Sequence, residues 1–282
     1  MVQESAPPEY AHLKIGNRVT ITDYYVPLPV SDDLKAFALK VFVRLNAKSV
    51  TFRNVSFAHS VIDGCYLRSC VFDSCDFTGC RFIGSNLHQS TFPGCKFDYA
   101  TFERCQIDDD ILDSEAPRQE NLRMRFARSL RMNYQQIGDA KAVNKAITLE
   151  LEATSRHLLE SWYSDSTYHR KKYPGLLRVA QFLHWIEFWI LHFVWGNGES
   201  IFKLLRSIVI AVLIIAIYDA GSLSAQATVY DYWESLKLAP GVFLGTVARA
   251  HHSIGAASAI VATKLVALSL LTALLVKRFG RR

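Results

Sequence analysis

The chain has 282 residues, a hydrophobic fraction of 50% and a formal net charge of +6, so it is long enough for two or three domains. Residues 1–107 carry a net charge of +1, residues 108–166 a net −3 and residues 167–282 a net +8. Because the basic excess coincides with the most apolar runs, we interpret it as Lys and Arg flanking membrane segments and exclude a nucleic-acid-binding face.

The first 47 residues are assigned to an N-terminal cap. The opening MVQESAPPEY lacks the basic and apolar regions of a secretory signal, so we expect this part to stay in the cytosol. The segment VTITDYYVPLPV is typical of an extended chain, and Pro27 and Pro29 restrict it to the edge of a sheet. The apolar stretch from Leu34 to Leu45 is predicted to be a short helix or a first coil.

A period of five residues begins at residue 50. A large apolar residue recurs at every fifth position, and a small or medium-sized residue stands two positions before each one. The large residues are Phe52, Phe57, Ile62, Leu67, Phe72, Phe77, Phe82, Leu87, Phe92, Phe97, Phe102 and Ile107. The small ones are Val50, Val55, Ser60, Cys65, Cys70, Cys75, Cys80, Ser85, Ser90, Cys95, Ala100 and Cys105. This period fits neither a helix nor a strand, so it predicts a solenoid built from turns.

These two columns resemble the motif of the pentapeptide-repeat family over residues 48–107. The resemblance implies a right-handed quadrilateral β-helix with four pentapeptides per coil. So short a solenoid buries little and needs capped ends, and we expect it to serve interaction or assembly, with a cytosolic protein as its partner. Some family members mimic DNA through an acidic face, but this segment holds six basic and five acidic side chains, so no nucleic-acid role is expected.

All six cysteines fall in the small-residue column, which the family points into the coil. They lack the paired spacing of a zinc site, so we expect free thiols packed as small hydrophobic groups and predict no metal and no cofactor. Redox reactivity of a stacked pair such as Cys75 and Cys95 is the alternative.

Residues 108–166 are predicted to form a helical hairpin. Apolar residues recur at steps of three and four from Leu122 to Ile137 and from Val143 to Leu151, and Gly138 with Asp139 breaks the run. The acidic stretch before the first helix is interpreted as a solvated linker.

Residues 167–200 are predicted to hold an interfacial amphipathic helix. Between positions 173 and 195, aromatic residues alternate with Arg178, His184, Glu187 and His192, a pattern suited to the headgroup region of a bilayer. A buried core helix is the alternative.

Two membrane crossings are predicted within residues 201–282. The first runs from Ile201 to about Tyr218 and the second from about Ile254 to Val276. Basic residues lie at the start of the first and after the end of the second, while the loop 219–253 carries a net −1. We therefore expect a protein of the cell (inner) membrane with both termini in the cytoplasm.

The loop between the crossings starts like a short amphipathic helix and ends in a possible re-entrant segment with Pro240, Gly241, Gly245 and Thr246. This order of parts resembles bacterial pentapeptide-repeat proteins with a C-terminal two-helix, potassium-channel-like module. The resemblance implies a homo-oligomer, with a tetramer suggested. The family's filter motif is missing, since GVFLGT stands in its place, so potassium selectivity is not predicted.

Three polar residues of this module are candidates for function. Lys264 lies in the middle of the last apolar segment, and we expect it to line a pore or a polar subunit interface. His251 and His252 are candidates for an outer-surface pH sensor. Because adjacent residues point in different directions, a metal site shared by the two histidines is not expected.

The sequence thus favours a homo-oligomeric membrane pore, not selective for potassium and gated by its cytosolic repeat domain, with a stress or defence role. The alternative is a membrane-anchored scaffold that presents the repeat domain to a protein partner. No catalytic motif stands out, so we expect no enzyme. The expected partners are the lipid bilayer, other copies of the chain and a cytosolic protein.

Overall fold

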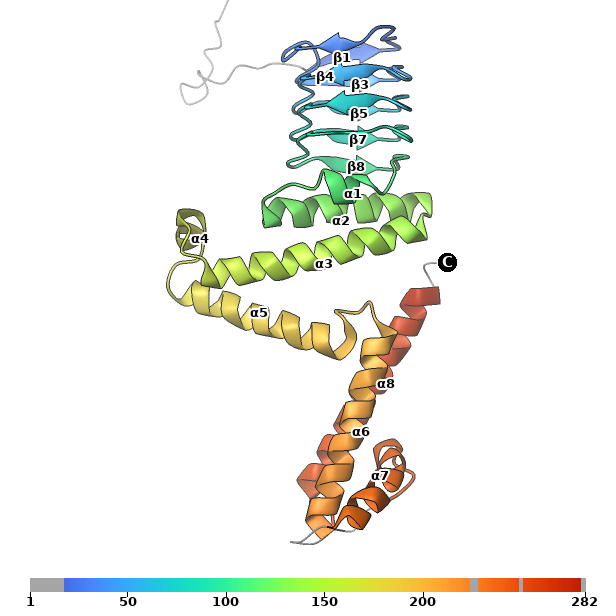
Figure 1. Ribbon diagram of the computed structural model, residues 1–282, viewed down its shortest axis with the longest axis vertical. Helices are drawn as coiled ribbons and strands as arrows, with labels where there is room; N and C mark the ends of the chain where they lie inside the picture. The colour runs from blue at the N-terminus through green and yellow to red at the C-terminus, as the bar shows by residue number, and fades with distance from the viewer. Residues whose placement is uncertain (1–17, 224–227, 249–250, 280–282) are drawn as a thin grey trace, which may run out of the picture. The chain divides into compact units, whose positions relative to one another are not determined.

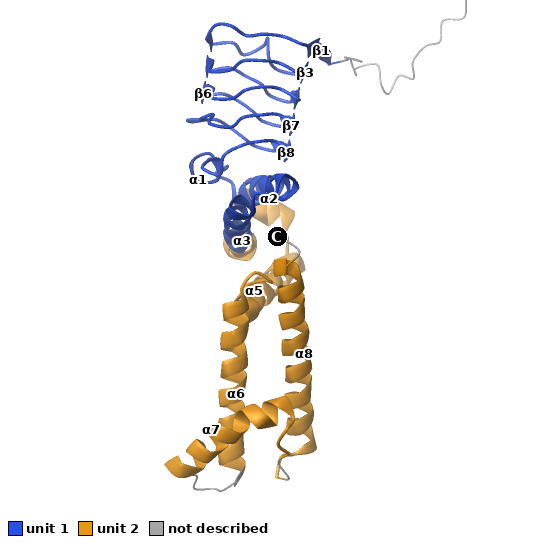
Figure 2. Cartoon of the chain, turned by 90° about the vertical axis from the view of Figure 1, so that its right-hand side faces the viewer, with its two compact units in different colours: residues 1–157 blue, residues 158–282 orange. Residues whose placement is uncertain are grey.

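The computed structural model describes residues 18–223, 228–248 and 251–279. The chain divides into two compact units, residues 1–157 and residues 158–282, which are drawn in different colours in Figure 2.

The first unit opens with a solenoid of parallel strands stacked in coils (Figure 1). One sheet has the strand order β1-β3-β5-β7-β8 and the other the order β2-β4-β6. The strands are β1 (Val19–Thr22), β2 (Val30–Ser31), β3 (Lys40–Val43), β4 (Thr51–Arg53), β5 (Val61–Asp63), β6 (Val71–Asp73), β7 (Arg81–Ile83) and β8 (Thr101–Glu103). From β3 onward each strand pairs with the residues 20 positions further along, as in Val41 with Val61, so four pentapeptides make one coil. The predicted pentapeptide β-helix is confirmed.

The coil begins before the predicted boundary at residue 48. Strand β1 pairs with β3 and β2 pairs with β4, so residues 18–47 belong to the solenoid rather than to a separate cap. Of the two predictions for the stretch from Leu34 to Leu45, the first coil is the one the structure contains. The period is hard to see here because the two columns exchange sizes: Leu45 fills the small position and Ala47 the large one, and both are buried.

The solenoid interior is filled by stacked phenylalanines. Phe52, Phe72 and Phe92 form one stack with ring centroids 5.1 and 5.3 Å apart. Phe57, Phe77 and Phe97 form a second, with spacings of 5.0 and 5.1 Å. These spacings are close to the separation of paired strands, about 4.8 Å. The distance from one coil to the next therefore suits both the backbone hydrogen bonds and the stacked rings.

The small column makes a hydrogen bond that also recurs from coil to coil. Ser60, Ser85 and Ser90 donate through Oγ to a carbonyl 23 residues earlier, over 2.6 to 3.0 Å. Cys70 and Cys80 donate through Sγ to the corresponding carbonyls over 2.6 and 2.7 Å. The cysteines therefore occupy the same structural place as the serines, and all six are free thiols, as expected.

Helices follow the last coil and cover its end. They are α1 (Ile111–Ser114), α2 (Glu120–Ile137) and α3 (Ala140–Tyr163), and α2 ends at Gly138, whose φ of 79° suits a glycine. The hairpin of α2 and α3 confirms the predicted break at Gly138 and Asp139. Side chains of α2 accept hydrogen bonds from backbone N–H groups of the final coil, as Ser129 does from Phe102, Asn133 from Cys105 and Gln136 from Arg104.

The second unit contains α4 (Thr167–Lys172), α5 (Leu176–Trp195), α6 (Ile201–Leu223), α7 (Val229–Leu244) and α8 (Ile254–Phe279). Within the described residues, two helices are long and apolar enough to cross a membrane, Ile201–Ser222 and Ile254–Phe279. Only 17% and 11% of their most apolar windows are buried inside the chain, so most of their apolar surface is exposed. No residue of α5 is buried, which argues against the core-helix alternative for that segment.

The three helices α6, α7 and α8 form one module. Figure 2 shows α6 and α8 running alongside each other in opposite directions, with α7 crossing near the end of α6. Its buried cluster consists of Ile215 and Ala216 of α6, Ala239, Val242 and Phe243 of α7, and Ala267 of α8. This packing fixes where the short helix α7 ends relative to the two long ones.

Candidate functional site

The short helix α7 has a defined beginning and end. Thr228 caps its N-terminus in a capping box, with Oγ1 accepting from the N–H of Asp231 while Asp231 accepts from the N–H of Thr228 over 2.8 Å. Gly245 ends the helix in the left-handed conformation, with φ of 82°. The caps at both ends of α7 therefore fix the positions of its last carbonyl groups.

Lys264 lies at this carbonyl end of α7. Its ammonium group donates to the carbonyl oxygen of Leu244 over 3.4 Å. Lys264 is half-buried and shares a face of α8 with Ile260 and Ala267, which pack into the buried cluster of the module. A positive charge at the C-terminus of a helix is stabilised by the helix dipole, which accounts for a lysine within so apolar a helix.

The structure places the candidate re-entrant residues in α7 and in the turn that follows it. Pro240 and Gly241 lie inside α7, which continues to Leu244. Beyond Gly245, the chain turns back on the helix, with the N–H and Oγ1 of Thr246 both donating to the carbonyl of Gly241, over 2.9 and 3.1 Å. The segment is thus a helix followed by a tight turn.

His251 and His252 do not point apart. The Nε2 atoms of both rings lie near the same oxygen, Oδ1 of Asp219, at 2.7 and 3.0 Å. The argument that adjacent histidines point in different directions, and so cannot share a metal site, is therefore wrong. Asp219 was expected in the outer loop, but α6 extends past Tyr218 to Leu223 and carries Asp219 in a buried position. The sequence feature that could have marked Asp219 as a functional residue is its place directly after a long apolar run.

A second polar cluster joins α8 to the start of α6. Lys277 Nζ donates to the carbonyl of Gly198 over 2.9 Å and to a carboxylate oxygen of Glu199 over 2.5 Å. Nearby, the guanidinium of Arg206 donates to the carbonyl of Phe193, and Ser207 donates to that of Val194 over 2.9 Å. These bonds tie α5, α6 and α8 together at one end of the module, and sequence reasoning did not pair them.

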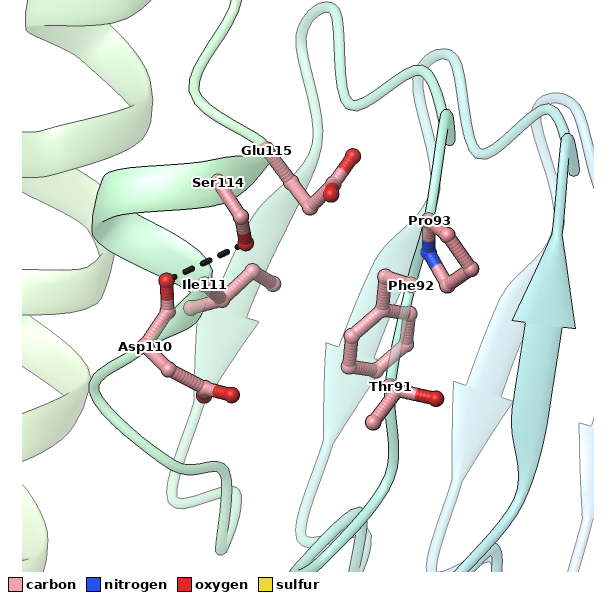
Figure 3. Close-up of a pocket in the computed structure, with 7 residues that line it drawn as sticks. All are labelled: Thr91, Phe92, Pro93, Asp110, Ile111, Ser114 and Glu115. Carbon is pink, nitrogen blue, oxygen red and sulfur yellow. Dashed lines mark hydrogen bonds between the residues drawn. The ribbon is translucent and has the colours of Figure 1, made fainter.

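A shallow open pocket of about 270 Å³ lies in the first unit, where the face of the solenoid meets α1 (Figure 3). Its wall is formed by Thr91, Phe92, Pro93, Asp110, Ile111, Ser114 and Glu115. Ser114 donates to the carbonyl of Asp110 over 3.2 Å, and partial burial raises the pKa of Glu115. The polar groups here hold the turn of α1, and their arrangement resembles neither a catalytic set nor a metal site.

Comparison with known proteins agrees with this architecture in the repeat region. The family model for pentapeptide repeats matches with eight copies over residues 51–89 and 75–109. A solved structure of a trypsin-treated QnrB1 variant, described as a plasmid-mediated fluoroquinolone resistance protein, is similar over 32% of this chain and 81% of that one. The identity is 9% and the TM-score 0.16, so this likeness carries no argument. No curated protein matches the chain. Residues 51–109 are thus a run of pentapeptide repeats.

Proposed function

We propose that this chain forms a homo-oligomeric pore in the cell membrane, not selective for potassium and gated by its cytosolic repeat domain. The observation that carries the proposal is the position of the Lys264 ammonium at the carbonyl end of α7. Lys264 is the eleventh residue of α8, so it lies about 15 Å along that helix, halfway through a hydrocarbon layer of about 30 Å. An ionisable residue at that depth costs about 3 kcal/mol on insertion scales, and it commonly faces water or a bundle interior.

The short helix supports the same proposal. A helix that ends within the bilayer leaves its last carbonyl groups without partners, and such backbone is tolerated only where protein or water covers it. Lys264 satisfies the carbonyl of Leu244, and the turn at Thr246 satisfies that of Gly241. A pore beside this helix end would supply water to the remaining groups.

The exposed faces of the two spans support oligomerisation. Large apolar side chains such as Val209, Ile214 and Leu265 are more than half exposed in the single chain. Gly255, Ala259 and Ala262 line one exposed face of α8, and small residues allow two helices to approach closely. Other copies of the chain and lipid would together cover these surfaces, and the resemblance noted above suggests a tetramer.

Ion flux through liposomes that contain the purified chain tests the pore. We expect the wild type to pass ions, Lys264→Glu to shift the preference toward cations, and Lys264→Ala to show an intermediate preference. Lys237→Ala is the matched control, because Lys237 is exposed on α7 and pairs with Glu234 over 3.1 Å. Unchanged ion preference in both Lys264 variants would remove this residue from the pore.

Gating by the repeat domain has its own test. A designed binder directed at the solenoid should alter the flux of the full chain, whereas the same binder should have no effect when added to liposomes on the other side of the membrane. A binder that saturates the solenoid without changing the flux would contradict gating.

The alternative function is a membrane-anchored scaffold. It is supported by apolar side chains on the solenoid surface, where Tyr25, Leu39 and Tyr99 are 57% to 62% exposed and would contact a cytosolic protein. Liposomes that stay sealed under every gradient and ligand tested would favour the scaffold over the pore.

A further inference from the structure

Asp219, His251 and His252 bring three metal-ligating side chains to one point. Asp219 lies in the last turns of α6, and the two histidines lie just before α8. One ligand atom from each residue lies within 4.8 Å of the others. The side chains of Asp219 and His252 are 1% and 4% exposed, and that of His251 is 26% exposed. Asp219 and His252 are therefore buried, and His251 is the member of the cluster that solvent reaches.

The spacing of these atoms fits a metal ion. Zinc lies about 2.1 Å from imidazole nitrogen and carboxylate oxygen, so two of its ligand atoms are about 3.0 to 3.4 Å apart. Oδ1 of Asp219 is 3.0 Å from Nε2 of His252 and 2.7 Å from Nε2 of His251, so shifts of a few tenths of an ångström would suffice. The Tyr218 ring packs against that of His252, with centroids 5.3 Å apart, and supports its orientation.

The donor types select a class of metal. Two imidazoles and one carboxylate suit zinc, copper, nickel, cobalt or iron, whereas calcium and magnesium require sets of oxygen ligands. Three protein ligands also leave at least one coordination position for water or for another group on the His251 side.

We propose that Asp219, His251 and His252 bind one divalent transition-metal ion of the zinc class. The ion would tie the end of α6 to the segment that leads into α8, across a loop of more than 30 residues. It would thus brace the ends of the two spans, and it does not depend on whether the chain conducts ions.

The experiment is a titration of the full chain in detergent with Co²⁺, after removal of any histidine tag and of bound metal. We expect a visible absorption band that saturates at one ion per chain and that Zn²⁺ abolishes by competition. Asp219→Ala, His251→Ala and His252→Ala should each weaken Co²⁺ binding at least tenfold. His184→Ala is the control, because His184 is exposed on α5 beside Glu187 and should leave the titration unchanged.

Thermal unfolding supplies a second readout. Zn²⁺ should raise the unfolding temperature of the wild type and of His184→Ala, and it should not raise that of His251→Ala. The more exposed His251 is the most tolerant of the three positions, so this variant keeps the test valid if Asp219→Ala fails to fold. Absence of a Co²⁺ band in the wild type, or equal binding by the wild type and a folded His251→Ala, overturns the proposal.

Discussion

Asn133 of α2 and Cys105 of the last coil exchange two hydrogen bonds. The Cys105 N–H donates to Asn133 Oδ1 over 2.7 Å, and Asn133 Nδ2 donates to the Cys105 carbonyl over 2.9 Å. The amide of Asn133 thus stands where a further coil would lie: the N–H of Cys65 donates to Oγ of Ser85 in the next coil, and the Cys65 carbonyl accepts from the N–H of Asn86. Asn133 is fully buried, so no water competes for these bonds.

This pair predicts a large effect of Asn133→Leu on stability. The change leaves two buried backbone groups of Cys105 without partners, and each unsatisfied group costs about 1 to 3 kcal/mol. We expect the free energy of unfolding of the first unit to fall by about 3 kcal/mol, measured by urea unfolding followed with circular dichroism. Gln135→Leu, at an exposed position of the same helix, should change it by less than about 0.5 kcal/mol. Equal stability of the two variants would show that α2 does not cap the coil through Asn133.

The phenylalanine stacks predict that Phe77 is among the most sensitive core positions. It lies between Phe57 and Phe97 with nearly parallel rings, at interplanar angles of 14° and 10°. Phe77→Ala should lower the free energy of unfolding by about 3 to 5 kcal/mol because it opens a cavity in the solenoid. Phe77→Leu should cost less, since Leu67 and Leu87 fill equivalent positions. Tyr99→Ala, at a site that is 57% exposed, is the control, and a Phe77→Ala effect no larger than that of Tyr99→Ala would contradict this prediction.

The buried thiols predict a loss of stability at alkaline pH. Burial raises the pKa of Cys65 to about 11 and that of Cys80 to about 12, from an ordinary 9.0. The unfolded chain releases these protons first, so stability is full below about pH 9 and declines as the pH rises toward 12. Replacing both residues with serine should flatten this decline, because serines occupy equivalent places at Ser60, Ser85 and Ser90. A decline of the same slope in the double variant would assign it to other groups.

The same burial predicts slow reaction of the thiols with alkylating reagents in the native state. Hydrogen bonding with the Cys75 thiol, together with burial, raises the pKa of Cys95. Hydrogen bonding with Cys95 lowers the pKa of Cys75, and burial of Cys75 keeps reagents from its thiol. We expect iodoacetamide to modify none of the six cysteines rapidly at pH 8 in the folded chain and all six in urea. Rapid labelling confined to Cys75 or Cys95 would instead support the redox alternative for that pair.

The contact between Lys277 and Glu199 predicts a measurable coupling between the end of α8 and the start of α6. Their side chains are 42% and 22% exposed, so the ion pair is expected to contribute about 1 kcal/mol. A double-mutant cycle of Lys277→Met and Glu199→Gln on thermal stability in detergent measures it. The exposed pair Lys237 and Glu234 on α7 is the reference and should give about 0.3 kcal/mol. A coupling at Lys277 no larger than at this reference would show that the contact does not hold the helices.

The sequence predicted the repeat, the hairpin and the two apolar helices because each has a periodic or compositional pattern within a short stretch. It left the first coil as one of two alternatives, beside a short helix, because Leu45 and Ala47 exchange the sizes on which the pattern depends. It placed Asp219 in a loop because the helical conformation of α6 continues past the apolar run. Lys264 was identified by its charge within an apolar segment. Its partner, the carbonyl of Leu244, was not, because every residue has a backbone carbonyl and the sequence does not show which one a lysine contacts. The convergence of Asp219 with His251 and His252 depends on how the chain folds back over more than 30 residues.

The solenoid repeats every 20 residues, so each coil adds the same length and completes one full turn of the chain. Duplicating four pentapeptides would lengthen it by about 4.8 Å and return every later side chain to the same face. Adding a single pentapeptide would instead turn everything after it by a quarter of a revolution relative to the coils before it, while Asn133 and Cys105 would turn together and keep their contact. Growth of such a chain is therefore restricted to whole coils wherever its far end must keep its orientation.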